Sequence, residues 1–298
     1  MLYKHAFQAL DSLEIGVSSA FSWQRNGYIQ YFNVSSHQNL NVQDNVNFNM
    51  KISIITVCYN RASVIQKAIE SVLAQTYKNI EYIVVDGAST DGSMKIIETY
   101  KNRIQRIVSE PDHGMYEAIN KGIRMATGDI VGLMHSDDYF YDNRTVESIA
   151  QAFEESGADL VYGNGVYVEH DRTERMVRKW ISGEYQRKKV ARGWLPLHPT
   201  VYIRREKMEE LGLYNESFHI AADSELLVRY LYKADLKVHY LNRYITVQRM
   251  GGLSTCSQHC KEKWNEDLRM YRMHGIPSYY ALCRKVLSKI PQFLKARI

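Results

Sequence analysis

The fold of this chain is decided by the stretch Lys51-Ile52-Ser53-Ile54-Ile55-Thr56-Val57, which is followed at once by the polar loop Cys58-Tyr59-Asn60-Arg61. A short apolar run bounded by polar residues is typical of a strand buried in a parallel sheet. Further runs of this kind occur at residues 80–85, 104–108, 130–134 and 159–162. The chain therefore contains a series of short strands that begins close to Met50.

Helical patterns separate these runs. Residues 62–75 place Ile65, Ala68, Ile69, Val72 and Leu73 on one face, and residues 92–100, 115–126 and 145–155 are similar. Strands that alternate with amphipathic helices predict a doubly wound α/β fold with a largely parallel sheet. In such sheets, ligands bind beyond the carboxyl ends of the strands.

Polar loops follow three of the predicted strands. They are Cys58–Arg61, Asp86-Gly87-Ala88-Ser89-Thr90-Asp91-Gly92 and Ser136-Asp137-Asp138. Because the carboxyl ends of parallel strands share one edge of a sheet, we expect these loops to converge. None of them has the glycine pattern of a dinucleotide site or of a P-loop, which argues against an oxidoreductase and an NTPase.

The Asp137-Asp138 pair directly follows the apolar run that ends at Met134. Carboxylate oxygens at a strand end are suitable ligands for Mg²⁺ or Mn²⁺ beside a phosphate. The same pair is also common in turns and helix caps, and residues 143–150 do look like the start of a helix.

The three loops, together with four further motifs, resemble the glycosyltransferases of family 2. In order, the further motifs are Ser109–Gly122, Leu197-His198-Pro199, Ala221-Ala222-Asp223 and Gly251-Gly252-Leu253-Ser254. The resemblance spans Lys51 to about Thr255. It implies a GT-A fold, with a Rossmann-like, mostly parallel central sheet flanked by helices and followed by C-terminal helices.

The resemblance also implies an activity. This is inverting, metal-dependent transfer of a hexose or N-acetylhexosamine from a nucleotide sugar, expected to be a UDP-sugar, to a saccharide or lipid-linked saccharide. The expected setting is bacterial capsule, O-antigen or exopolysaccharide synthesis. The nucleotide half would cover residues 50–140 and the acceptor half residues 141–255.

Several residues match nucleotide-binding positions of that family. They are Thr56, Tyr59, Asn60, Arg61, Asp86 and Asp137. Tyr59 would stack on the base, and Asp86 would accept a hydrogen bond from the uracil imide, which suits an acceptor-only carboxylate. Many relatives carry a second acidic residue where this chain has Gly87, so the resemblance leaves the base selectivity open.

The chemical step would depend on two carboxylates. Asp138 would bind Mg²⁺ or Mn²⁺ directly, with Asp137 at the ribose or the water shell of the metal, and Ser136 occupies the first position of the D-x-D pattern. Asp223 would be the general base that deprotonates the acceptor hydroxyl. A helix N-cap is the alternative interpretation of Asp223.

Donor sugar or diphosphate contacts are expected from Asp112, Lys121, His198 and Arg249. Each has a structural alternative: a helix cap for Asp112, a buried structural imidazole for His198 and an exposed cation at a strand end for Arg249. The paired glycines at 251 and 252 are typical of a loop that closes over a donor.

The two ends of the chain differ from its centre. Residues 1–49 are polar and aperiodic, and we expect an extension before a natural start at Met50. Residues 256–298 are expected to be helical, and residues 276–298 contain five basic and no acidic residues with apolar residues at helical spacing. Such a helix is suited to an anionic membrane surface. The alternative is a helix packed on the domain with solvated lysines.

Composition limits the partners and the location. The formal charge of +5 is small for a nucleic-acid binder, so no nucleic-acid partner is expected. Four cysteines without paired spacing, no signal peptide and no transmembrane run predict a cytoplasmic protein, peripheral on the inner face of the cytoplasmic membrane. Two other classes stay open: a catalytically weak sugar-nucleotide-binding scaffold and a metal-dependent phosphohydrolase.

Overall fold

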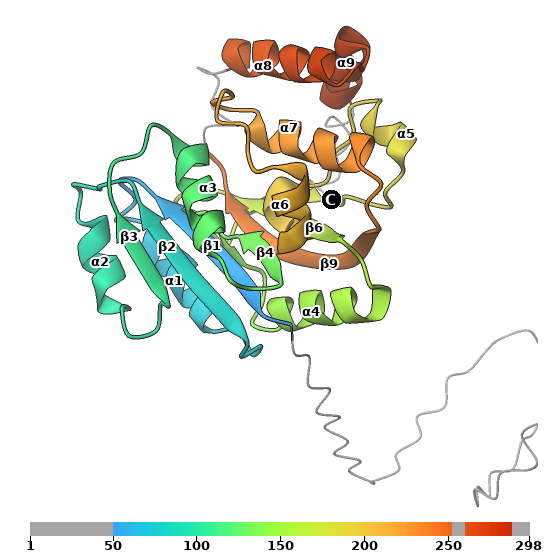
Figure 1. The fold of residues 1–298 in the computed structure, drawn as a ribbon. Helices are drawn as coiled ribbons and strands as arrows, with labels where there is room; N and C mark the ends of the chain where they lie inside the picture. The colour runs from blue at the N-terminus through green and yellow to red at the C-terminus, as the bar shows by residue number, and fades with distance from the viewer. Residues whose placement is uncertain (1–49, 252–259, 288–298) are drawn as a thin grey trace, which may run out of the picture. The chain divides into compact units, whose positions relative to one another are not determined.

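A mixed sheet forms the centre of the computed structural model, which describes residues 50–251 and 260–287 (Figure 1). Within these residues the sheet has nine strands in the order β3-β2-β1-β4-β8-β6-β9-β5, with β7 beside β6. The strands are β1 (Ile52–Cys58), β2 (Ile80–Asp86), β3 (Arg106–Ser109), β4 (Ile130–Leu133), β5 (Tyr139–Phe140), β6 (Leu160–Val168), β7 (Met176–Trp180), β8 (Tyr202–Arg204) and β9 (Val238–Arg249).

The sheet is parallel where the sequence predicts it. β1 pairs with β2 and β4 in parallel, β2 pairs with β3, and β6 pairs with β9. β8 is antiparallel to both β4 and β6 and therefore joins two parallel groups that run in the same direction. Ile52 is level with both Ile80 and Ile130, so β1, β2 and β4 begin together; β1 and β2 end level with each other, and β4 ends opposite Ile55. The mostly parallel α/β fold is confirmed.

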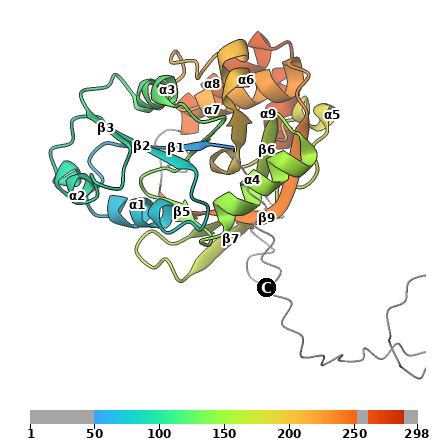
Figure 2. The ribbon, with the colours of Figure 1, turned by 60° about the horizontal axis from the view of Figure 1, so that its bottom comes forward.

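Helices cover both faces of the sheet (Figure 2). They are α1 (Ile65–Leu73), α2 (Ser93–Thr99), α3 (Met115–Met125), α4 (Thr145–Ser156), α5 (Arg187–Val190), α6 (Arg205–Leu211), α7 (Ala222–Val228), α8 (Cys260–Met273) and α9 (Ser278–Leu287). A short 3-10 helix, η1 (His198–Thr200), precedes β8, and a π-helical turn, η2 (Arg229–Lys233), continues α7.

The period of the strands explains the two layers. In β1, Ile52 and Ile54 point to the core under α1, α2 and α4, whereas Ile55 and Val57 point to the core under α3, α6 and α7. Successive side chains of a strand face opposite sides, so a run that is apolar throughout must be covered on both faces. This is why β1 is buried along its whole length.

The junction between β4 and β8 depends on a glycine. A Cβ atom on Gly132 would lie 2.0 Å from the ring of Tyr202, which is completely buried. The aromatic ring therefore occupies the space that a side chain at position 132 would need. Only glycine allows the antiparallel strand to pack here.

The predicted boundaries differ from the structure mainly in the second half. The run at 159–162 is only the beginning of β6, which continues to Val168. The helix expected over residues 225–232 begins three residues earlier, at Ala222, and ends in the π-helical turn. No helix among the described residues is both long and apolar enough to cross a bilayer.

The C-terminal helices α8 and α9 lie beside α7 (Figure 1). α9 packs against the domain through Ala281 and Leu282. Tyr279, Val286 and Leu287, which belong to the apolar pattern of this segment, are exposed. The extension at 1–49, the loop residues 252–254 and the last residues, 288–298, lie outside the described residues.

Candidate active site

The loops after β1 and β2 hold each other at the carboxyl edge of the sheet. The backbone N–H of Asn60 donates to Ser89 Oγ at 2.8 Å, and the N–H of Thr90 donates to Asn60 Oδ1 at 2.9 Å. Asn60 and Ala88 both adopt the left-handed conformation, with φ of 52° and 58°. Strained non-glycine residues of this kind cluster at functional sites. The first two predicted loops therefore do converge.

The aromatic ring of Tyr59 and the carboxylate of Asp86 lie at the ends of the two strands that these loops follow. Tyr59 is 63% exposed, although it is large and aromatic. Asp86, at the end of β2, is completely buried, and its Oδ2 accepts from the N–H of Ser89 and the hydroxyl of Ser109. Asp86 Oδ1 is buried too, but it has no hydrogen-bond partner within residues 50–251 and 260–287. Such an orphaned acceptor requires an explanation, and a ligand donor provides one.

Gly87, the residue after Asp86, leaves space open next to Tyr59 and Asp112. A Cβ atom there would lie 3.3 Å from Asp112 Oδ2 and 3.4 Å from the Tyr59 ring. Asp112 Oδ1 pairs with Lys121 Nζ at 2.6 Å, whereas its Oδ2 is buried with no partner in the described part of the chain. Lys121 also contacts Glu110, and its hydrogen bonds to Asp112 and Glu110 raise its pKa. Tyr59, Gly87 and Asp112 thus border one space, and Lys121 neutralises part of its acidic wall.

Two further predicted nucleotide residues have different surroundings. Thr56 is completely buried in β1, where its hydroxyl bonds with that of Tyr82 at 3.0 Å. Any part it plays in the pocket is therefore through holding β1 in place. Arg61 is exposed and donates to the carbonyl of Asn60.

The Asp137-Asp138 turn is held by β9. β5 follows the turn immediately and pairs Tyr139 with Val247, so the end of β9 lies against the two carboxylates. Asp138 Oδ2 accepts from Gln248 Nε2 at 3.1 Å, and Oδ1 accepts from the N–H of Arg249 at 3.2 Å. The guanidinium of Arg249 donates to the carbonyls of Asp137 and His170. Arg249 thus braces the turn, and its predicted diphosphate contact stays a prediction.

Asp138 is in an environment that suits a cation. Its side chain is 4% exposed, and burial raises its pKa well above the usual range, with the negative charge of Asp137 adding to the effect. Two close carboxylates in a dry site repel each other, and a divalent cation would relieve that repulsion. The oxygen donors fit Mg²⁺ or Mn²⁺. The described residues contain no cluster of three or more acidic, histidine or cysteine ligands.

The predicted base lies at the start of α7. The N-cap of α7 is Ala221, and Asp223 Oδ1 accepts from the adjacent N–H of Ser224 at 2.6 Å. Asp223 is therefore not the capping residue of this helix. Burial raises the pKa of Tyr167 on β6, and the charges of Asp138 and Asp223 add to this effect. Asp138 and Asp223 therefore both lie within electrostatic range of one buried tyrosine, Tyr167.

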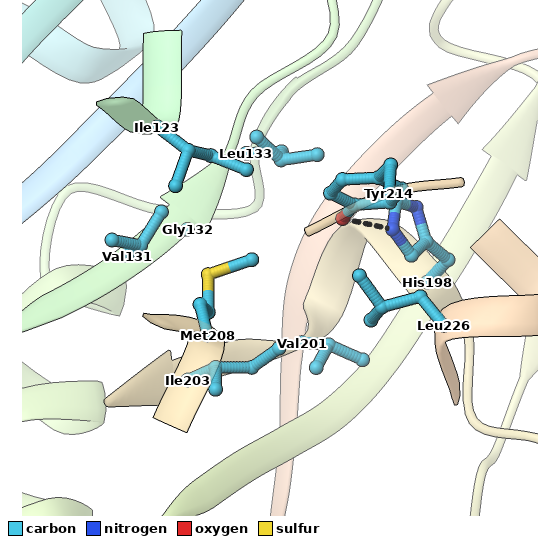
Figure 3. A pocket seen from close by; sticks show the side chains of 10 residues that line it. All are labelled: Ile123, Val131, Gly132, Leu133, His198, Val201, Ile203, Met208, Tyr214 and Leu226. Carbon is cyan, nitrogen blue, oxygen red and sulfur yellow. Dashed lines mark hydrogen bonds between the residues drawn. The ribbon is translucent and has the colours of Figure 1, made fainter. Parts of the chain in front are cut away.

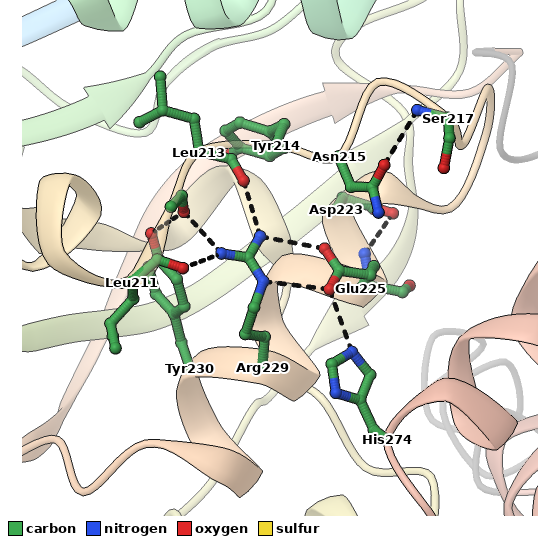
Figure 4. A network of polar contacts seen from close by, with 12 residues as sticks. Leu211, Leu213, Tyr214, Asn215, Ser217, Asp223, Glu225, Arg229, Tyr230 and His274 are labelled. Atoms are coloured by element: carbon green, nitrogen blue, oxygen red, sulfur yellow. Dashed lines mark hydrogen bonds and ion pairs between the residues drawn. The ribbon is translucent and has the colours of Figure 1, made fainter.

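Glu225 faces away from Asp223, into a separate polar network (Figure 4). It pairs with Arg229 and with His274, each at 3.0 Å, and Arg229 also donates to the carbonyls of Gly212 and Leu213. Burial would raise the pKa of Glu225, but the hydrogen bonds from His274 and Arg229 outweigh it and lower the pKa. This network fixes α7 to α6 and α8.

The His198 side chain lies inside the protein next to Tyr214 and His135 rather than in open solvent. Its Nε2 is 2.7 Å from the hydroxyl of Tyr214, and its ring centroid is 6.1 Å from that of His135. Burial lowers the pKa of His198 to about 4, so the imidazole is neutral at pH 7. His198 and Tyr214 border an apolar cavity of about 10 Å³ (Figure 3), which is at the lower limit for one water molecule. This cavity is too small for a sugar.

Sequence reasoning missed three residues at the site: Tyr167, Gln248 and Glu266. Gln248 and its partner Asp138 are 110 positions apart, so no local pattern links them. Glu266 lies on α8 and accepts from backbone N–H groups of the loop before Asp223. The only sequence signal for such a residue is an acidic group at a buried helical position.

Comparison with known proteins identifies the class. The family model described as glycosyl transferase family 2 matches residues 53–220, which is more than half of the 298 residues. The chain belongs to this family, and the fold and family that the motifs predicted are confirmed.

Characterised and uncharacterised relatives agree with this assignment. Glycosyltransferase GlyG of Streptococcus pneumoniae is 33% identical over 45% of this chain and 44% of its own length. An uncharacterized glycosyltransferase of Mycobacterium tuberculosis is 31% identical over 60% of this chain and 68% of its own. A PGL/p-HBAD biosynthesis glycosyltransferase of Mycobacterium bovis is 27% identical over 68% and 78%, respectively. The chain thus spans less than half of GlyG.

Solved structures share the fold. Staphylococcus aureus TarS 1-349 in complex with UDP-GlcNAc aligns with a TM-score of 0.59 and 20% identity over 74% of this chain and 65% of that one. The mannosyltransferase PcManGT of Pyrobaculum calidifontis in complex with GDP-Man and Mn²⁺ aligns with a TM-score of 0.54 and 16% identity, over 83% and 74%. At these identities the likeness shows the fold alone.

Proposed function

We propose that this glycosyltransferase moves a sugar from a nucleotide sugar to a saccharide or lipid-linked saccharide, with inversion and with the help of a divalent metal. The observation that carries the proposal is the buried carboxylate of Asp138, which Gln248 and Arg249 hold beside Asp137 at the turn after β4. Asp223, at the start of α7, lies within electrostatic range of the same buried tyrosine, Tyr167, as Asp138 does. Leaving-group and base chemistry can thus occur in one place.

The nucleotide would lie over the first two loops. Tyr59 offers an exposed ring for stacking, and Asp86 Oδ1 offers an acceptor that can take a base N–H. Uracil provides one such donor, and the UDP-GlcNAc complex of TarS supports a UDP-sugar. The orphaned Asp112 Oδ2 is a further acceptor near the same space, available to a sugar hydroxyl.

Asp138 would hold the metal, with Asp137 beside it and the remaining ligands from diphosphate oxygens and water. A bound Mg²⁺ or Mn²⁺ neutralises charge on the leaving nucleoside diphosphate. The Mn²⁺ complex of PcManGT supports this choice of ions. Gln248 and Arg249 would keep Asp138 oriented, because each gives its carboxylate one hydrogen bond.

Asp223 would take the proton of the acceptor hydroxyl. As that oxygen bonds to the anomeric carbon, the bond from this carbon to the diphosphate oxygen breaks on the opposite face, which inverts the configuration. The leaving group departs as nucleoside diphosphate. His198 is neutral at pH 7, so it would serve as a hydrogen-bonding group at the acceptor side rather than as a cation for phosphate.

A donor screen tests the proposal with the full chain. UDP-GlcNAc, UDP-glucose, UDP-galactose and GDP-mannose are each incubated with Mn²⁺, Mg²⁺ or EDTA, and donor hydrolysis and UDP affinity are measured. We expect metal-dependent slow hydrolysis of at least one donor, lost in Asp223→Asn by about 10²- to 10⁴-fold without loss of UDP affinity. Full turnover in Asp223→Asn would contradict the assignment of the base.

The same screen separates the other classes. A catalytically weak sugar-nucleotide-binding scaffold would bind UDP without turnover in any condition. A metal-dependent phosphohydrolase would cleave simple phosphate esters such as p-nitrophenyl phosphate. The retention of both Asp138 and Asp223 favours the transferase over the scaffold.

A membrane surface is the proposed location of the acceptor, and the chain would meet it from the cytoplasmic side. The described helices α8 and α9 expose Trp264, Met273, Tyr279, Tyr280 and Leu287. Exposed basic residues accompany them, namely Lys261, Arg269, Arg272 and Arg284. Aromatic and basic groups on one helical pair are suited to an anionic lipid interface. This supports a lipid-linked acceptor in cell-surface polysaccharide synthesis.

A further inference from the structure

A buried carboxylate on α8 binds the loop that leads into Asp223. Glu266 is 8% exposed, and its two oxygens accept from three consecutive backbone N–H groups. Oε1 accepts from His219 at 2.7 Å, and Oε2 accepts from Ile220 at 2.9 Å and Ala221 at 2.8 Å. Hydrogen bonds to an ionised acceptor are the strong ones, and these three are short. The loop is thus fixed two residues before the proposed base.

The opposite side of this loop is held by α3. The hydroxyl of Tyr116 donates to the carbonyl of Ile220 at 2.9 Å, and Asn120 exchanges hydrogen bonds with the N–H and carbonyl of Tyr214. The Ile220 peptide is therefore gripped at its N–H by Glu266 and at its carbonyl by Tyr116. Neither contact provides a chemical group to the site, so both act on geometry.

A second link from the C-terminal helices reaches the residue after the base. Lys285 on α9 donates to Asp267 at 2.8 Å and to Ser224 Oγ at 3.2 Å. Its side chain is 12% exposed, although the sequence suggested a solvated lysine. Helix α8 thus contacts the residues before Asp223, and α9 contacts the residue after it.

We propose that Glu266 is a positioning residue for Asp223, so that the C-terminal helical pair is part of what makes the site competent for transfer. This inference rests on the proposed function, because it assumes that Asp223 is the base. A displacement of about 1 Å in a reacting group can lower a rate by about 10²-fold. Within residues 50–251 and 260–287, the hydrogen bonds of Glu266 go to residues 219–221 and not to the nucleotide loops, so we expect donor affinity to be independent of it.

The test compares Glu266→Ala and Glu266→Gln with Glu81→Gln. Glu81 is a buried carboxylate at the start of β2 that also accepts a backbone N–H, that of Thr127, and it lies outside the proposed site, so it is the matched control for a lost buried charge. With the best donor of the screen above, we expect Glu266→Ala to lower kcat by about 10- to 100-fold at unchanged donor KM. The amide oxygen of Glu266→Gln still accepts, so this variant should recover part of kcat. Glu81→Gln should retain kcat.

Two further measurements distinguish a failure of the positioning role of Glu266 from a failure of the proposed function. Hydrogen exchange needs no substrate: the amides of His219–Ala221 should exchange faster in Glu266→Ala than in wild type or Glu81→Gln. In the Asp223→Asn background, Glu266→Ala should lower kcat no further.

Unchanged amide exchange, or equal kcat losses in Glu266→Ala and Glu81→Gln, would overturn the role of Glu266. If wild type turns over no donor, or Asp223→Asn retains full turnover, the proposed function fails instead. The positioning inference fails alone when Asp223→Asn is inactive and Glu266→Ala keeps wild-type kcat.

Discussion

Single atoms mark the donor side of this site. Asp86 Oδ1 and Asp112 Oδ2 are buried, and neither accepts a hydrogen bond within the described ranges. An unsatisfied buried acceptor costs about 1–3 kcal/mol, more when it is charged. The folded chain bears this cost at two places, of which Asp112 Oδ2 borders the space left by Gly87. Donor groups of a bound nucleotide sugar would remove it, so the residues are preorganised for a ligand.

Asp138→Asn should stabilise the metal-free protein and abolish transfer. The pKa of Asp138 is raised in the folded state, so the stability contributed by its neutral form is present at low pH and lost as the pH rises through the folded pKa. An asparagine stays neutral, and rotation of the Gln248 amide satisfies it. With EDTA we expect a higher Tm for the variant at pH 7.5 and a smaller difference at pH 5.

Activity with Mn²⁺ should fall by at least about 10²-fold in Asp138→Asn, because metal stabilisation of a leaving group amounts to several kcal/mol. Differential scanning fluorimetry and the donor assay measure the two effects. A variant that melts below wild type at pH 7.5 in EDTA would show that Asp138 is a structural hydrogen-bonding residue instead.

Tyr59→Ala should weaken nucleotide binding with little effect on stability. The ring is 63% exposed, so its removal leaves no cavity in the core. An aromatic pair contributes about 0.5–1.5 kcal/mol, which corresponds to a two- to twelve-fold rise in the Kd for UDP. Tyr59→Phe retains the ring and is the matched control. Titration calorimetry with UDP measures both, and equal affinities of all three proteins would exclude stacking.

Among the elements, strands and helices could be predicted from the sequence where a single hydrophobic period runs through the whole segment. Strands β1, β2 and β4 were found because a short apolar run suffices for a strand that is covered on both faces. The extent of β6 was missed because Gly163, Asn164 and Gly165 interrupt its apolar run, although they are buried. A buried strand can contain these three residues because β9 and residues after Trp180, which lie far away in sequence, form hydrogen bonds with this part of β6.

The candidate site divides in the same way. Loops at the ends of β1, β2 and β4 could be predicted, since their polar residues follow apolar runs directly. The support of Asp138 by Gln248 and of the Asp223 loop by Glu266 could not, because each contact joins distant segments. The outward orientation of Tyr279 and Leu287 was likewise set by packing, as α9 contacts α8 through its other face.

Glu81→Gln should make the parallel half of the sheet less stable and less sensitive to acid. Glu81 on β2 accepts from Ser53 on β1 at 2.6 Å and from Thr127, just before β4, at 2.7 Å. Burial alone would raise its pKa, but these hydrogen bonds outweigh it and lower the pKa to about 2. A depressed folded pKa contributes stability above the unfolded value of 4.5 that is lost as the pH falls toward 2.

The shift of Glu81 corresponds to about 3 kcal/mol at neutral pH. Urea unfolding of wild type and Glu81→Gln at pH 7, 5 and 3 should show a gap that narrows toward pH 3. Glu154→Gln, at an exposed position on α4, is the control. A gap that is constant with pH would show that the charge of Glu81 is not responsible.

For the whole molecule, the C-terminal helices have two faces with different tasks. The inner face carries Glu266 and Lys285, which contact the residues on either side of Asp223. The outer face carries aromatic and basic residues that are suited to lipid. A protein that meets its acceptor at a membrane would thus be oriented by the same helices that complete its site.

Replacing the outer aromatic residues should release the protein from lipid without affecting donor turnover. In Trp264→Ser/Tyr279→Ser/Tyr280→Ser we expect loss of sedimentation with vesicles that contain anionic phosphatidylglycerol, because each removed ring loses its interfacial contact. Vesicles of phosphatidylcholine alone are the control for charge. Equal sedimentation of variant and wild type would place the lipid contact elsewhere or exclude it.

The grip of Glu266 on residues 219–221 has a consequence for the order of synthesis. The ribosome makes the parallel half of the sheet first, and N-terminal parts of a chain generally fold first. A nascent chain that ends before α8 would already contain the loops for the nucleotide and the Asp137-Asp138 turn, but three N–H groups before Asp223 would still lack their acceptor. Such a chain could bind a nucleotide sugar before it could transfer the sugar, so turnover would begin only after α8 has been made.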